Sequence, residues 1–166
     1  MTAASDQTAL VSCMRNEGLF LLEWLAYHQT LGFDHVVVVS NDCTDGSDAL
    51  LDALAAAGHL THIRQSVPPG TPPQDAGMAL VLDWARAQGV TWLLHIDSDE
   101  FLNVTAGDGR LPDLMANAAE ADVVAIPWQL FGDAGITEWT PGMAVLPSFT
   151  RAEPAPEPRV TKSKCL

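Results

Sequence analysis

Hydrophobic residues along this chain follow two alternating patterns. A short run at 9–13 with the composition of a strand, four consecutive valines within 35–39, and a mostly apolar run that begins at Trp92 are typical of the strands of a parallel sheet. Between them, 19–31 and 75–88 carry apolar residues at helical spacing, and a glycine follows each. This alternation predicts the α/β fold class, with a Rossmann-like, mostly parallel sheet and helices on both faces. The expected strands are 9–13, 35–39, 60–65, 92–96 and 122–129, and the expected helices are 19–31, 48–57, 75–88 and 111–119.

The strand that begins at Trp92 ends abruptly in acidic residues. Asp97, Asp99 and Glu100 place three carboxylates within four residues, directly after a mostly apolar run. If the backbone stays extended, Asp97 and Asp99 point the same way, because residues two apart share one face of a strand. Two such carboxylates repel unless a proton or a cation lies between them, and their hard oxygens suit Mg²⁺ or Mn²⁺. The simpler alternative is a polar loop whose acids are merely solvated.

Polar turns also follow the first two expected strands. The carboxyl ends of parallel strands meet at one edge of a sheet, where open α/β proteins bind their ligands. We therefore expect these turns and the acidic segment to share one cleft. An equally simple role for Glu17 is to favour the start of the following helix through its dipole. The residues expected to line the cleft are Arg15, Asn16, Glu17, Asn41, Asp42, Asp97 and Asp99.

Composition narrows the class of ligand. The 166 residues suit one domain, and the formal net charge of −13, from 8 basic and 21 acidic residues, argues against nucleic acid as a partner. Both lysines, Lys162 and Lys164, lie in the last five residues. If the ligand is a phosphate, a metal must therefore supply much of the positive charge. Three cysteines without paired metal spacing, no signal peptide and no transmembrane segment predict a cytoplasmic protein.

Several of these segments occur together in a recognisable order. The segments are Arg15-Asn16-Glu17, 20–28, 31–33, 41–47 and 92–102, with 128–132 as an extension. In this order and spacing they resemble the bacterial branch of family-two glycosyltransferases. The resemblance implies a GT-A-like nucleotide-sugar-binding fold, a nucleotide-diphospho-sugar donor, a glycan or other hydroxyl acceptor, and Mn²⁺ or Mg²⁺.

The resemblance also implies roles for individual residues. Asp97 would lie near the nucleotide ribose and the metal, and Asp99 on the metal that bridges the diphosphate. The segments at 15–17 and 41–42 would surround the base and ribose. Ser40 departs from the pattern, because many family members carry an acid there. We therefore expect base contacts at this position to differ.

The last part of the chain matches the family least well. We expect a single glycosyltransferase-like domain over 1–166, with a nucleotide-sugar-binding core at 8–132 and an irregular, incomplete acceptor part at 133–166. The family continues beyond this point, so the resemblance suggests a truncated protein that transfers sugar slowly or not at all. The general base is unknown, and Asp133 and Glu138 are weak candidates because they follow a strand.

Two alternatives to a metal-dependent glycosyltransferase stay open. One is a non-catalytic remnant that binds a nucleotide sugar. The other is an Asp-x-Asp phosphotransferase, in which Asp97 would be the nucleophile and Asp99 the acid/base. Glu100-Phe101 after the motif, and the lack of any lysine before residue 162, argue against this second alternative.

Overall fold

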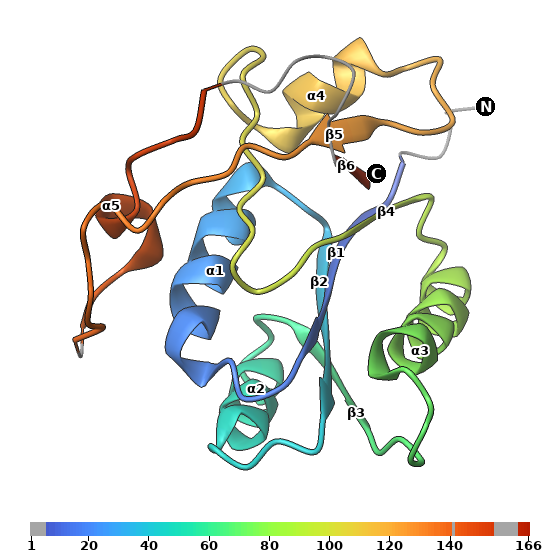
Figure 1. Ribbon diagram of the computed structural model, residues 1–166. Helices are drawn as coiled ribbons and strands as arrows, with labels where there is room; N and C mark the ends of the chain where they lie inside the picture. Colours follow the sequence, from blue (N-terminus) through green and yellow to red (C-terminus); the bar gives the residue numbers. More distant parts are fainter. Residues whose placement is uncertain (1–5, 141, 155–162) are drawn as a thin grey trace.

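A four-stranded parallel sheet forms the centre of the protein (Figure 1). The computed structural model describes residues 6–140, 142–154 and 163–166. The strand order is β3-β2-β1-β4, and every neighbouring pair is parallel. The α/β fold predicted from the sequence is therefore confirmed. The strands are β1 (Thr8–Met14), β2 (His35–Asn41), β3 (Thr61–Gln65) and β4 (Trp92–His95).

Helices cover both faces of this sheet, because both faces of its central strands are apolar. Val36 and Val38 of β2 pack into one core cluster with Trp24 and Leu51, which lie on α1 and α2. Val37 and Val39 point to the opposite face and pack against Val81 of α3 (Figure 1). None of the helices in the described residues is long and apolar enough to cross a membrane. The three helices are α1 (Gly18–Leu31), α2 (Ser47–Ala56) and α3 (Pro73–Gln88).

The fifth expected strand lies outside the parallel sheet. The sequence predicted a strand over 122–129 in the mostly parallel sheet, but β5 covers only Ala125–Pro127. It pairs antiparallel with β6 (Ser163–Cys165) in a separate two-stranded sheet. That expected placement is wrong because the apolar pattern of a strand does not specify its partner. Two short helices, α4 (Leu111–Asn117) and α5 (Val145–Ser148), complete the described elements.

Helix α1 holds the segment that follows β4. The hydroxyl of Tyr27 donates a hydrogen bond to the carbonyl of Leu102 at 2.8 Å. The amide of Leu102 donates to Nε2 of His28 at 3.2 Å. The rings of Tyr27 and His28 also pack on Phe101, with centroids 5.4 Å and 5.8 Å away. The aromatic face of α1 thus positions the chain just after the acidic motif.

His28 must be neutral in this arrangement. Its Nδ1 lies 2.8 Å from the carbonyl oxygen of Trp24, which can only accept, so Nδ1 carries the proton. Its Nε2 must then accept from Leu102, which a protonated ring cannot do. Burial lowers the pKa of His28 to about 4, although the hydrogen bond to Trp24 opposes this shift.

We predict that stability falls as the pH is lowered from about 6.5 to 4. In this window the unfolded chain protonates His28 while the folded chain keeps it neutral, so protons favour unfolding. A shift of this size corresponds to roughly 3 kcal/mol. Urea unfolding at a series of pH values measures it. His28→Leu should flatten this part of the profile, whereas His59→Gln, which removes an exposed histidine, should leave it unchanged.

Candidate functional site

Three loops meet at one edge of the parallel sheet. They follow β1, β2 and β4, which are neighbours in the strand order and run in the same direction. Between β1 and β4 the order of the strands reverses, because β2 and β3 extend the sheet on the other side of β1. Such a switch point is where open α/β sheets bind ligands. The structure therefore brings the turns at residues 15–17, 41–42 and 97–99 to one edge of the sheet, and the shared cleft stays a prediction.

The loops after β1 and β2 are joined by Asn16. Its Oδ1 accepts from the amide of Thr44 at 2.7 Å, and its Nδ2 donates to the Thr44 hydroxyl at 3.1 Å. Asn16 and Asp42 both have a positive φ, of 60° and 46°. Asn and Asp tolerate this left-handed backbone better than other residues with a side chain. Arg15 and Asp42 are exposed beside this link, and Asn41 is buried at the end of β2.

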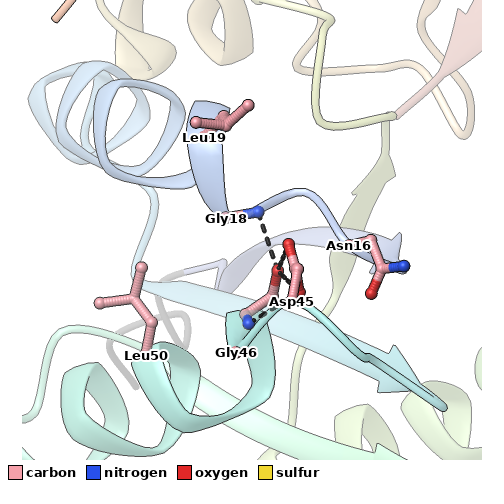
Figure 2. A pocket seen from close by; sticks show the side chains of 7 residues that line it. Asn16, Gly18, Leu19, Asp45, Gly46 and Leu50 are labelled. Carbon is pink, nitrogen blue, oxygen red and sulfur yellow. Dashed lines mark hydrogen bonds between the residues drawn. The ribbon is translucent and has the colours of Figure 1, made fainter. Parts of the chain in front are cut away.

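A pocket of about 480 Å³ lies next to Asn16, between the first turns of α1 and α2 (Figure 2). The Asp45 carboxylate accepts hydrogen bonds from the hydroxyl and the amide of Ser47, which lower the pKa of Asp45. The Ser47 hydroxyl accepts in turn from the amide of Gly18 at 2.8 Å. Asp45 and Ser47 thus close a turn and connect the two helix starts. The lining residues are Asn16, Gly18, Leu19, Asp45, Gly46, Ser47 and Leu50.

Residues 97–100 form a tight turn. The amide of Glu100 donates to the carbonyl of Asp97 at 3.2 Å, and the amide of Asp97 donates to the Glu100 carboxylate at 2.8 Å. Strand β4 has already ended at His95. The premise that Asp97 and Asp99 share one face of an extended strand is therefore wrong, because the backbone turns before the second aspartate.

The carboxylates of this turn differ in their surroundings. The ammonium of Lys164 lies 3.2 Å from both Asp97 and Glu100. Gln74, in the first turn of α3, donates to the other oxygen of Asp97 at 3.4 Å. Asp99 is exposed, and its carboxylate forms no hydrogen bond or ion pair with any described residue. One carboxylate at this edge is thus free to meet a ligand.

Two carboxylates of the acidic turn could take part in a metal site that a ligand completes. Among the described residues, no group of three or more His, Cys, Asp or Glu could hold a metal ion by itself. Mg²⁺, however, is often held by only one or two carboxylates, with phosphates and water completing its shell. The free Asp99 and the half-exposed Asp97 suit that kind of shared site, and they are the residues that would hold the ion.

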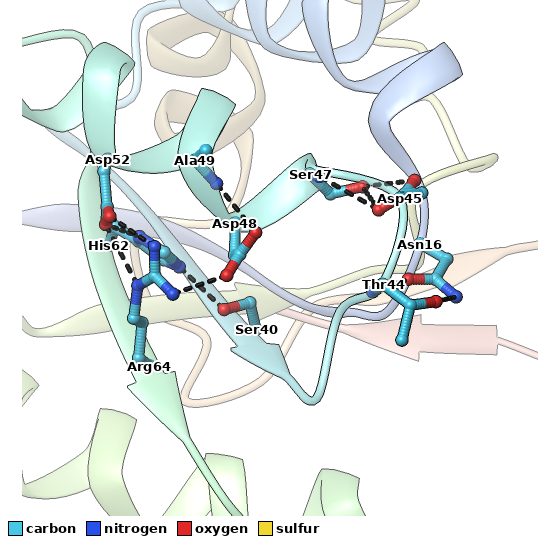
Figure 3. A network of polar contacts seen from close by, with 10 residues as sticks. All are labelled: Asn16, Ser40, Thr44, Asp45, Ser47, Asp48, Ala49, Asp52, His62 and Arg64. Carbon is cyan, nitrogen blue, oxygen red and sulfur yellow. Dashed lines mark hydrogen bonds and ion pairs between the residues drawn. The ribbon is translucent and has the colours of Figure 1, made fainter.

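A second polar network lies away from the acidic turn, between α2 and β3 (Figure 3). Ser40 Oγ lies 2.8 Å from Nε2 of His62, and Nδ1 of His62 lies 2.7 Å from Asp52. Arg64 pairs with Asp48 and Asp52. The order resembles a serine nucleophile with its base, but only 3% of Ser40 is exposed, so its hydroxyl is closed to a substrate. The network thus connects α2 to β3 at the edge of the sheet.

The two weak candidates for a general base lie on the surface. Asp133 and Glu138 are exposed, and Asp133 accepts a hydrogen bond from the amide of Gly135 at 2.9 Å. Within the described residues, neither forms a hydrogen bond or ion pair with the acidic turn. Glu17 caps no backbone amide of α1 with its side chain. The sequence analysis missed the roles of Lys164 and Gln74, since nothing local to either residue indicates its contact with Asp97.

Comparison with known proteins relates the chain to glycosyltransferases. It is 28% identical over 156 residues to a glycosyltransferase family 92 protein of Ricinus communis. It is also 28% identical over 147 residues to a family 92 protein of Oryza sativa subsp. japonica. These matches cover 91% and 87% of this chain but 27% and 24% of the relatives. The chain thus spans about a quarter of the length of these curated relatives.

A solved structure supports the fold. The structure of S. aureus TarS matches with a TM-score of 0.51 and 19% identity, over 73% of this chain and 21% of that chain. No protein-family model matches. The expected resemblance to glycosyltransferases is confirmed at this level, whereas the relatives named here are plant proteins of family 92 and not bacterial proteins of family two.

Proposed function

We propose that this chain is the donor-binding part of a metal-dependent glycosyltransferase. The donor is a nucleotide-diphospho-sugar, and the acceptor is a glycan or another hydroxyl compound. The observation that carries the proposal is the acidic turn at the switch point of the sheet, where Asp99 is free and Asp97 lies beside it. The similarity to family 92 proteins over most of the chain supports the same class of reaction.

The chain's own residues would divide the donor between two sides of the edge. Asp97 and Asp99 would face the diphosphate through Mn²⁺ or Mg²⁺. Asn16 and Asp42, on the loops after β1 and β2, would lie toward the base and ribose, with Arg15 and Asn41 beside them. When bound, the cation would supply Lewis-acid stabilisation of the leaving diphosphate. Asp133 and Glu138 stay the candidates for accepting the proton of the acceptor hydroxyl.

A phosphotransferase is the second candidate, and one contact favours it. The ion pair between Lys164 and Asp97 is the kind of contact that such an enzyme would place on its nucleophile. The similarity to glycosyltransferases favours the first proposal. Incubation with p-nitrophenyl phosphate and Mg²⁺ separates the two, because only a phosphotransferase that uses Asp97 as nucleophile should release nitrophenol. Loss of that release in Asp97→Asn would identify the nucleophile.

We expect nucleoside diphosphates and their sugars to stabilise the protein only when Mn²⁺ or Mg²⁺ is present. The reason is that the acidic turn carries three carboxylates and one paired lysine, so it repels a diphosphate unless a further cation lies between them. At about 100 times its dissociation constant, a ligand adds roughly 2.7 kcal/mol, or some 5–10 °C in melting temperature. A thermal-shift screen with Mn²⁺ and with EDTA measures this. Equal stabilisation in EDTA would refute the metal bridge.

Asp99→Asn should abolish the metal-dependent shift while leaving the fold intact. Asp99 is exposed and has no partner among the described residues, so its neutralisation removes no internal contact. Asp97→Asn should weaken nucleotide binding more than metal binding. Asp108→Asn is the matched control, because Asp108 is also exposed and lies outside the acidic turn. If Asp99→Asn kept the same metal dependence as Asp108→Asn, the assignment of Asp99 would be wrong.

A further inference from the structure

The acidic turn already holds a cation that belongs to the chain. Lys164, on β6, places its ammonium 3.2 Å from Oδ2 of Asp97 and 3.2 Å from Oε2 of Glu100. Lys164 lies 67 residues away from Asp97 along the chain. The ammonium therefore lies between two carboxylates that would otherwise repel each other.

This lysine is held in place by its surroundings. Strand β6 pairs with β5, and Leu166 exchanges two backbone hydrogen bonds with Val124, at 2.9 Å and 3.0 Å. Leu166 is itself buried. The Lys164 side chain is 19% exposed, and its ammonium lies 5.6 Å from the ring centre of Trp128. The position is thus built by pairing, burial and a ring contact, unlike that of a free surface lysine.

The electrostatics favour the charged lysine. The carboxylates of Asp97 and Glu100, each 3.2 Å from the ammonium of Lys164, stabilise its positive charge. An ammonium beside Oδ2 of Asp97 repels a divalent ion that approaches either oxygen of this carboxylate.

We propose that Lys164 is a tethered cation that competes with the divalent metal for Asp97. The inference rests on the proposed metal site and deepens it, because it assigns a regulatory contact to that site. With Lys164 in place, the turn is stabilised without a metal. A divalent ion must then either displace the ammonium or bind Asp97 against its repulsion, and both weaken the binding of the ion. Because Lys164 lies on β6, the pairing of β6 with β5 would in this way affect how tightly the metal binds.

The Mn²⁺ concentration that gives half of the thermal stabilisation, at a fixed saturating concentration of a nucleoside diphosphate, tests the proposal. Lys164→Gln removes the competing charge and should tighten Mn²⁺ binding by roughly tenfold, the usual contribution of a hydrogen bond between charged groups. Lys164→Arg keeps the charge and should bind Mn²⁺ much as the unaltered chain does. Arg86→Gln removes a cation from an exposed ion pair on α3 and controls for the change in net charge.

The outcomes separate the inference from the function on which it rests. Tighter binding in Lys164→Gln but not in Arg86→Gln supports competition at Asp97. Equal Mn²⁺ affinity in the unaltered chain and Lys164→Gln would overturn the role of Lys164 and leave the metal site intact. An absence of Mn²⁺-dependent stabilisation in every variant would overturn the proposed metal site and this inference with it. Circular dichroism of each variant checks that the fold is kept.

Discussion

The acidic turn depends on two hydrogen bonds that the backbone of Leu102 makes with α1. Tyr27 satisfies its carbonyl and His28 its amide. Among the described residues, no strand supplies partners for the backbone of Leu102, and a buried amide left without a partner costs stability. A neutral, buried histidine is therefore part of what positions the candidate site. The aromatic packing on Phe101 adds to the same anchor, so that helix, turn and sheet edge form one unit.

The remaining loops are tied to one another across the sheet edge. Asn16 bridges the first two loops through Thr44, and Ser47 joins the starts of α1 and α2. Both links are hydrogen bonds of short polar side chains, which lie within a few residues of the end of a strand. The left-handed backbone at Asn16 and Asp42 is tolerated because these residue types adopt it more readily than others with a side chain. The edge of the sheet thus has two sides: amides and hydroxyls lie around Asn16 and Thr44, and carboxylates lie at the acidic turn.

Charge decides how these two sides can act. The chain carries a formal net charge of −13, so its negative electrostatic potential repels an approaching diphosphate. At the acidic turn this charge is offset locally by Lys164. The same electrostatic argument favours both the internal lysine and an external divalent ion. If a divalent ion binds as proposed, the local balance between it and Lys164 would set how the turn responds to a ligand.

The sequence by itself determined the order of strands and helices and the edge where the polar turns meet. These follow from local periodicity, as in the valine run of β2, and from the rule that parallel strands end on one side. Only the tertiary structure decided that β5 pairs with β6, that the chain turns after His95, and that Lys164 reaches Asp97. Strand partners, backbone turns and ion pairs between distant residues depend on how the packed elements bring distant parts of the chain together. A local pattern of side chains does not specify these contacts.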